Sequence, residues 1–257
     1  MEGVAKLSIL QFSLIYLLLI IVLIIMKKSK IKQTKLLLVS SIRMTVQLIL
    51  AGLILTYIFE NQHPLFTVAY LIAMIAFAIY RILSQSKELN IKFKLIISAS
   101  LLFSGLFVLS YFILVVTRQN LFNPQYTIPI AGMIMGNSMT GITLGLKTFQ
   151  ENIKGQRPQL ESLINLGVHP KRILLPFANT ALETALLPTL NSMLGLGIIY
   201  LPGMMTGQIL SGTLPMTAIM YQIAIMIAIC TSVCLTTFCA LFFGYRTLYN
   251  SEMQIVF

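Results

Sequence analysis

Few residues of this chain have the types and spacing that catalysis requires. The sequence contains no Asp, only two His (His63 and His169), and no pair of carboxylates within one apolar run. General acid–base and nucleophilic catalysis need such groups as close neighbours. The segment nearest to a phosphate-binding loop, GNSMTG at 136–141, is followed by Ile142 and Thr143 where Lys and then Ser or Thr are required. The sequence therefore predicts that the chain is not an enzyme, and its residues leave any metal ligands unknown.

A second group of residues places polar side chains inside apolar runs, where they must find partners or line a wet cavity. Asn137 and Thr140 lie among glycines spaced four apart, a pattern that is also typical of close helix packing. Asn191 follows a proline, and Gln208 ends LPGMMTGQ at 201–208, which fits either a gate or a re-entrant outer turn. Nearby methionines suit a soft metal ion or simple packing. We expect Asn137, Thr140, Asn191 and Gln208 to line a substrate path.

Two charged residues stand within apolar surroundings. Arg43 shares one helical face with Ser40 and Gln47, so its side chain either turns toward the bundle interior or extends to the lipid headgroups. Glu183 is isolated, and a charge at the bilayer centre costs about 3 kcal/mol on insertion scales. We favour an interfacial ion pair of Glu183 with Arg172 or Arg43 over a proton or cation relay.

Composition decides the protein class. Of the 257 residues, 57% are hydrophobic and 10% are charged, which leaves too little polar surface for a soluble enzyme. The 18 basic residues outnumber the 7 acidic ones, but they cluster between apolar runs and form no hydrated basic face for nucleic acid. Three cysteines are too few for a disulfide framework. The sequence predicts an all-α integral membrane protein.

A hydrocarbon core about 30 Å thick requires roughly 20 apolar residues per helix. On this measure the chain has seven spans, at 7–26, 36–59, 66–83, 95–116, 128–146, about 187–209, and 216–243. The basic residues of the six connections number 5, 0, 4, 1, 5 and 0. Because basic loops stay in the cytoplasm, we expect the N-terminus outside and the C-terminus inside.

The fifth connection is the one long segment between spans. Leu160, Leu163, Ile164 and Leu166 recur there at helical spacing, which predicts an amphipathic cytoplasmic helix. After Gly167 and Pro170 a second helical pattern runs through Glu183 toward Pro188, where we expect the sixth span to begin.

Several motifs carry a family resemblance. Glu161, Gly167 and then Ile173 to Pro176 resemble the EAA loop of ABC-transporter permeases, although Ser162 and Leu163 replace its two alanines and the gap before Ile173 is shorter. The segments GNSMTG, LGVHP, ALLPTLNSM and LPGMMTGQILSG, within about residues 36–248, are similar to the iron-export permease family of bacterial ABC transporters (FetB-like), which includes plant proteins of aluminium tolerance.

The resemblance implies a single permease domain over residues 1–257 with a cytoplasmic coupling segment over 149–186. It implies an exporter of iron or another metal in a bacterial cell membrane, with ATP and Mg on a separate ATP-binding subunit, no cofactor on this chain, and a homodimer of permease subunits in contact with lipid. The residues expected to contact the ATPase are Glu161, Gly167, Pro170, Lys171 and Arg172. The alternative is a secondary carrier or channel, driven by an ion gradient, that uses Glu183.

Overall fold

The computed structural model describes residues 8–61 and 63–249, and helices dominate this part of the chain. The long elements are each bounded by caps, prolines or glycines. They are α1 (Ile9–Leu14) with α2 (Tyr16–Lys28), α3 (Thr34–Glu60), α4 (Pro64–Gln85), α5 (Ile91–Tyr111) with the π-helical turn η1 (Phe112–Val116), α6 (Pro124–Gly155), α8 (Pro170–Gly195) and α10 (Pro215–Gly244). The short elements are α7 (Arg157–Asn165), α9 (Gly203–Leu210) and the 3-10 turn η2 (Tyr245–Thr247).

The prediction of an all-α membrane protein with about seven transmembrane helices is confirmed. Among the described residues, six helical segments are long and apolar enough to cross a membrane, the first of them Leu10–Lys28. The remaining predicted span, 128–146, lies within α6, which has 32 residues but is less apolar because it carries the polar groups of the GNSMTG segment. The predicted start of the first span, Leu7, lies outside the described residues, as do both chain ends.

The predicted boundaries of the sixth span are wrong. One continuous helix, α8, runs through Pro176 and Pro188, and α9 is a separate short helix. Proline interrupts helices in water, but in membrane helices neighbouring groups satisfy the backbone that it frees. The span therefore covers Pro170–Gly195 and not 187–209. The second half of the expected coupling segment, from residue 170 onward, belongs to this transmembrane helix.

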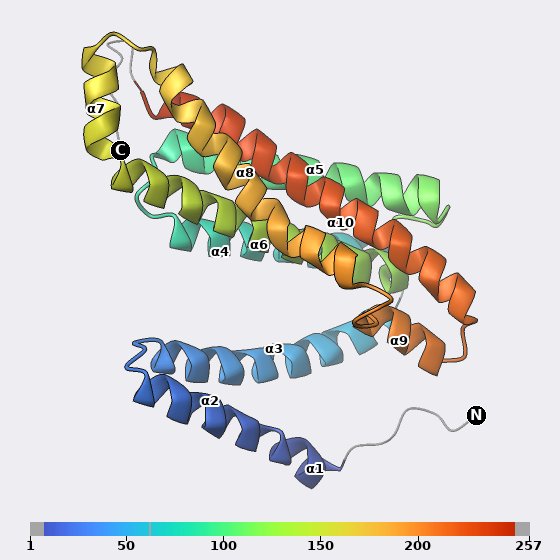
Figure 1. Cartoon of the computed structure of the whole chain (residues 1–257). Helices are drawn as coiled ribbons and strands as arrows, with labels where there is room; N and C mark the ends of the chain where they lie inside the picture. The colour runs from blue at the N-terminus through green and yellow to red at the C-terminus, as the bar shows by residue number, and fades with distance from the viewer. Residues whose placement is uncertain (1–7, 62, 250–257) are drawn as a thin grey trace.

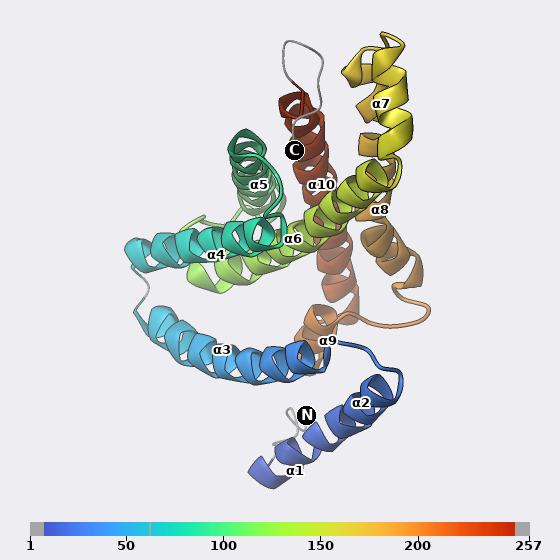
Figure 2. The same ribbon diagram turned by 90° about the vertical axis from the view of Figure 1, so that its left-hand side faces the viewer.

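Five helices form the core. Helices α4, α5, α6, α8 and α10 pack together, with α10 in contact with α5, α6 and α8. The first two spans lie at the periphery: α2 has no buried residue and α3 has only Ile58 among the described side chains. Figure 2 shows α1 and α2 set apart from the core helices, with α3 between them and the core. Their exposed apolar side chains match a lipid environment.

Consecutive spans alternate in direction. Figure 1 shows the α2–α3 and α4–α5 connections and α7 at one end of the bundle, with α9 at the other. The first end, here called the basic end, carries the connections 29–33 and 86–90 and the segment 156–169. Lysines and arginines are concentrated beside these connections, whereas the opposite connection 117–123 contains Arg118 alone.

Small residues bring α6 close to α8 and α10. A methyl group added to Gly141 would lie 2.5 Å from Val233 Cγ1 and 3.2 Å from the carbonyl oxygen of Ala185. A methyl group added to Gly145 would lie 3.0 Å from the carbonyl oxygen of Ala181. Such close backbone approach is the usual role of small residues spaced four apart in membrane helices. Gly136 differs, because nothing lies within 4 Å of the added methyl.

Candidate functional site

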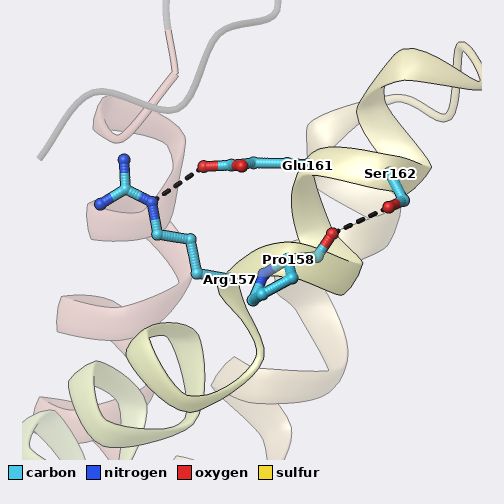
Figure 3. A network of polar contacts seen from close by, with 4 residues as sticks. All are labelled: Arg157, Pro158, Glu161 and Ser162. Carbon is cyan, nitrogen blue, oxygen red and sulfur yellow. Dashed lines mark hydrogen bonds and ion pairs between the residues drawn. The ribbon is translucent and has the colours of Figure 1, made fainter.

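The segment between α6 and α8 forms a sharply turned corner at the basic end. Arg157 Nε donates to Glu161 Oε1 at 2.9 Å along α7, and Ser162 Oγ donates to the carbonyl oxygen of Pro158 (Figure 3). The helix ends in a glycine turn, where the N–H groups of Gly167 and Val168 donate to Ile164 and Leu163. Gly167 has φ +80°, a conformation that glycine adopts without strain.

Helix α8 begins directly after this turn. The Nδ1 atom of His169 accepts from the N–H of Lys171 at 3.1 Å and caps the helix. Pro170 is the first helical residue, a position where its missing N–H has no cost. The sequence therefore placed both the glycine turn and the proline start correctly. We name residues 157–172 the α7–α8 corner.

The five residues expected to contact an ATPase are thus brought to one corner. Glu161, Gly167, Lys171 and Arg172 are exposed, whereas Pro170 is buried. Glu161 is held by Arg157, and no ion pair of the described residues includes Lys171 or Arg172. The corner offers two free cations beside an ion-paired carboxylate to any protein that docks there.

The sequence analysis did not predict that two of the four apolar residues at the same corner are exposed. Leu160 is buried and Ile164 is half-buried, as the amphipathic pattern predicts. Leu163 is 40% exposed, and Leu166 is 78% exposed at the C-cap of α7. Leu166 lies two positions after Ile164, outside the i, i+3, i+4 pattern of Leu160, Leu163 and Ile164, and this offset was the available signal. Leu163 and Leu166 therefore add exposed apolar surface to the basic corner.

Three of the four expected path residues lie on the outside of the bundle. Asn137 and Thr140 on α6 and Asn191 on α8 are all exposed. The side-chain amide of Asn137 donates to the carbonyl oxygen of Met133 at 2.8 Å. The hydroxyl of Thr140 donates to the carbonyl oxygen of Gly136 at 3.0 Å. Within one chain these side chains line no enclosed path, because they face away from the core helices.

The fourth path residue, Gln208, lies apart from the other three. It belongs to α9, which packs against α10 at the end opposite to the basic end. Its Oε1 atom is buried without a hydrogen-bond partner in the described part of the chain, and so is Oε1 of Gln222 on α10. Gln222 lines a cavity of about 300 Å³ with Leu201 and Met205. Sequence reasoning did not single out Gln222.

The two intramembrane charges do not meet. The guanidinium of Arg43 lies over the ring of Phe77 on α4, 5.3 Å from its centroid, an arrangement that favours a cation–π contact. Arg172 lies 11 residues before Glu183 on the same helix, about 16 Å along its axis. The ion pairs of the described residues do not include Glu183, which is exposed near the middle of α8. The expected interfacial ion pair is therefore wrong.

A metal site inside a single chain is likewise absent from the described residues. They contain no group of three or more His, Cys, Asp or Glu side chains close enough to hold an ion. The three cysteines, Cys230, Cys234 and Cys239, are unbridged and half-buried along α10.

The long, apolar, alternating helices define a multi-pass α-helical membrane protein. Comparison with known proteins is consistent with this class. The chain belongs to UPF0014, an uncharacterised protein family, which it matches over residues 9–249. No solved structure matches this chain.

Bacterial and plant relatives cover most of the chain. It is 30% identical over 233 residues to the UPF0014 membrane protein YjkA of Bacillus subtilis, covering 89% of this chain and 90% of that protein. It is 31% identical to the "Probable iron export permease protein FetB" of Escherichia coli, covering 89% and 87%. The Arabidopsis thaliana protein ALUMINUM SENSITIVE 3 is 33% identical over 184 residues, covering 72% and 66%. The chain is a multi-pass bacterial membrane permease of this family.

Proposed function

We propose that this chain is the permease subunit of an ATP-driven exporter of iron or another metal, coupled to a separate ATP-binding subunit. The functional complex contains two permease chains and two ATP-binding chains in the bacterial cell membrane. ATP and Mg are bound by the partner, and this chain carries no cofactor. The relative named as an iron export permease supports the substrate class.

The single observation that carries this proposal is the α7–α8 corner. Its capped helix, glycine turn and proline start give it a defined shape. Exposed Lys171, Arg172 and Leu166 supply charge and apolar surface for a protein partner. Because α8 continues directly from the corner into the membrane, a movement of the partner would tilt a transmembrane helix.

Topology supports the same assignment. The basic end carries the α7–α8 corner, and basic connections remain on the cytoplasmic side. The N-terminus is then outside and the C-terminus inside, and the corner faces the compartment that contains ATP. Single cysteines introduced as Asn61→Cys and Leu166→Cys, and labelled from each side of the membrane, test this orientation.

Copurification tests the coupling. The full chain is extracted from native membranes, and the associated proteins are identified and assayed for ATPase activity. The natural chain should bring an ATP-binding subunit, and Lys171→Glu or Leu166→Glu should reduce its recovery at least tenfold. Lys92→Glu makes the same charge change at the basic end, outside the corner, and should bind normally.

Two results would overturn this proposal. One is a natural chain that is recovered without any ATP-binding subunit. The other is equal recovery of that subunit by the corner variants and by Lys92→Glu. A monodisperse size-exclusion peak for each variant separates loss of binding from loss of folding.

A second candidate function rests on Glu183. An unpaired carboxylate in the middle of a span is the group that a gradient-driven carrier would need. Liposomes that contain this chain alone distinguish the two functions. Metal transport driven by a proton gradient without any ATP-binding subunit would favour the carrier, and transport that requires ATP and the partner would exclude it.

A further inference from the structure

One face of α8 is exposed along the whole helix. Its residues are spaced four, three, four, four, three and four positions apart, so they form a single stripe. We call this stripe the α8 stripe, and it consists of Arg172, Pro176, Asn179, Glu183, Leu187, Leu190 and Leu194. The core helices that pack on α8 are α6 and α10, and they contact its other side. The α8 stripe is therefore an unpartnered surface within one chain.

Glu183 lies at the centre of this stripe and near the middle of α8. It lies 13 residues after Pro170 and 12 residues before Gly195, about 20 Å and 18 Å along the helix axis. The hydroxyls of Thr180 and Thr184 donate instead to the carbonyl oxygens of Pro176 and Thr180, at 3.2 Å and 2.8 Å. A carboxylate facing hydrocarbon at this depth is strongly disfavoured. The stripe must therefore face something other than lipid.

Helix α6 extends the polar surface at the same depth. Gly141 lies against Ala185 and Gly145 against Ala181, so the two helices run antiparallel with Glu183 at the level of Thr143. In this register Asn137 lies near the level of Thr189, about 9 Å from that of Glu183. The side-chain NH₂ group of Asn137 donates to the carbonyl oxygen of Met133. The side-chain oxygen of Asn137 therefore remains free to accept a hydrogen bond or to coordinate a cation. Oxygen atoms thus line the exposed faces of both helices.

A second copy of this chain is the occupant that fits the α8 stripe. The apolar half of the stripe, Leu187, Leu190 and Leu194, has the spacing at which one helix packs on another. Copies inserted in the same direction and related by a twofold axis bring equivalent residues to the same depth. Each copy would then place its own Glu183 opposite that of the other. Lipid cannot solvate these groups, whereas a facing copy supplies matching polar atoms.

Two facing carboxylates require a positive charge between them. Like charges at short range repel, and each site then favours either a proton or a bound cation. Two Glu183 carboxylates with amide oxygens of Asn179 or Asn137 provide hard oxygen ligands, which suit divalent ions such as Mn²⁺ or Fe²⁺ better than soft ions. No single chain holds such a group in its described residues. The ligand set is complete only when two copies meet.

We propose that two copies of this chain pack through the α8 stripe and that their Glu183 carboxylates bind one divalent cation between them. This cation site deepens the proposed function, on which it rests, by identifying the substrate site of the exporter. It also assigns a role to the exposed amides of α6 and α8, which then face the path between the two copies.

Binding of Mn²⁺ tests the shared site. The full chain is reconstituted in nanodiscs of phosphatidylcholine and phosphatidylglycerol and titrated with Mn²⁺, which is followed by electron paramagnetic resonance. The natural chain should bind one tight Mn²⁺ per two chains, and Glu183→Gln should weaken this binding at least tenfold. Glu60→Gln removes the same charge from the exposed end of α3 and should leave it unchanged.

The stoichiometry and the Glu183→Gln variant are independent tests of the shared site. One Mn²⁺ per chain, no tight binding, or tight binding that survives Glu183→Gln would overturn it. These outcomes do not depend on an ATP-binding partner. Mn²⁺ binding with the expected stoichiometry, together with failed copurification, would instead reject the ATP coupling and leave the cation site standing.

Cross-linking tests the interface without any metal. In a background with Cys230, Cys234 and Cys239 replaced by alanine, Leu187→Cys should form a disulfide-linked dimer under mild oxidation. Phe107→Cys is the matched control, because it lies on α5 at a similar distance from the basic end and is 54% exposed, against 51% for Leu187. Phe107→Cys should remain monomeric. Equal cross-linking of the two variants, or none for Leu187→Cys, would overturn the interface.

Discussion

Replacement of Gly141 by alanine measures the close contact that fixes α6 against α8 and α10. Alanine stabilises a helix interior by about 1 kcal/mol relative to glycine. The new methyl would lie 2.5 Å from Val233 Cγ1, and Val233 is fully buried, so relief requires a shift of the packed core. Overpacking of this kind costs about 1–3 kcal/mol. We expect Gly141→Ala to lower the free energy of unfolding by about 1 kcal/mol.

Gly136→Ala is the matched control on the same helix. Nothing lies within 4 Å of its added methyl, so the gain in helix propensity is not opposed. We expect Gly136→Ala to raise the free energy of unfolding by about 0.5–1 kcal/mol. The two variants should therefore differ by roughly 2 kcal/mol in an unfolding titration with sodium dodecyl sulfate in mixed micelles.

A double-mutant cycle identifies the atom responsible. Val233→Ala alone should destabilise by about 2 kcal/mol, because it removes two buried methyl groups. Combined with Gly141→Ala, it vacates the space that the new methyl needs, so the pair should be about 1–2 kcal/mol more stable than the sum of the single changes. A coupling energy of zero, or equal stabilisation by alanine at 141 and at 136, would refute the close packing of α6.

Three further changes are expected to separate strong contacts from weak ones in the same titration. Ser138→Ala removes a buried hydrogen bond of 2.8 Å to Ser232 and should cost about 1 kcal/mol; the double alanine variant should cost little more, since it leaves no hydroxyl unpaired. Asn90→Ala removes both the cap of α5 and a hydrogen bond from its side-chain amide to the carbonyl oxygen of Thr247 in η2, and a loss of about 1–2 kcal/mol is expected. Lys154→Ala breaks an ion pair with Glu88, and the two side chains are 58% and 61% exposed. Exposed ion pairs contribute little, so the free energy of unfolding should fall by less than about 1 kcal/mol, and a larger loss would contradict this reasoning.

The sequence predicted the number of spans because bilayer thickness sets a length that apolar composition alone can meet. It failed at the sixth span, because Pro188 was interpreted as the boundary where that span begins. The structure carries the helix through Pro176 and Pro188, with Ser192 Oγ donating to the carbonyl oxygen of Pro188 at 2.9 Å. Proline is a boundary signal calibrated on helices in water, and the membrane removes the competing solvent.

That single error changed the predicted depth of Glu183 in the membrane. A span that begins at residue 187 leaves Glu183 near the headgroups, where an ion pair with Arg172 would be favourable. A span that begins at Pro170 places the same carboxylate mid-membrane and moves Arg172 out of reach. The residue was singled out correctly from its isolation in an apolar run, but its depth depends on where the helix starts, which is a property of tertiary packing.

The α7–α8 corner was more predictable because its signals are local. Gly167 and Pro170 act through their own backbone conformations, and both occupy the positions that their chemistry favours. The exposure of Leu166 was not predictable in this way, since it depends on which neighbours α7 meets. Local backbone chemistry can therefore be read residue by residue, whereas the choice between buried and exposed leucines needs the assembled bundle.

The α7–α8 corner and the proposed cation site lie on one helix, and this links energy input to transport. Pro170 begins α8 at the corner, and Glu183 follows 13 residues later without an interruption of the helix. Pro176 lies between them and lacks an N–H to donate, so the helix is weakest against bending at that point. A partner that moves the corner would rotate or bend α8 and separate the two Glu183 carboxylates. A cation held by both copies would then lose half of its ligands, which is the change in affinity that an exporter needs to release its substrate.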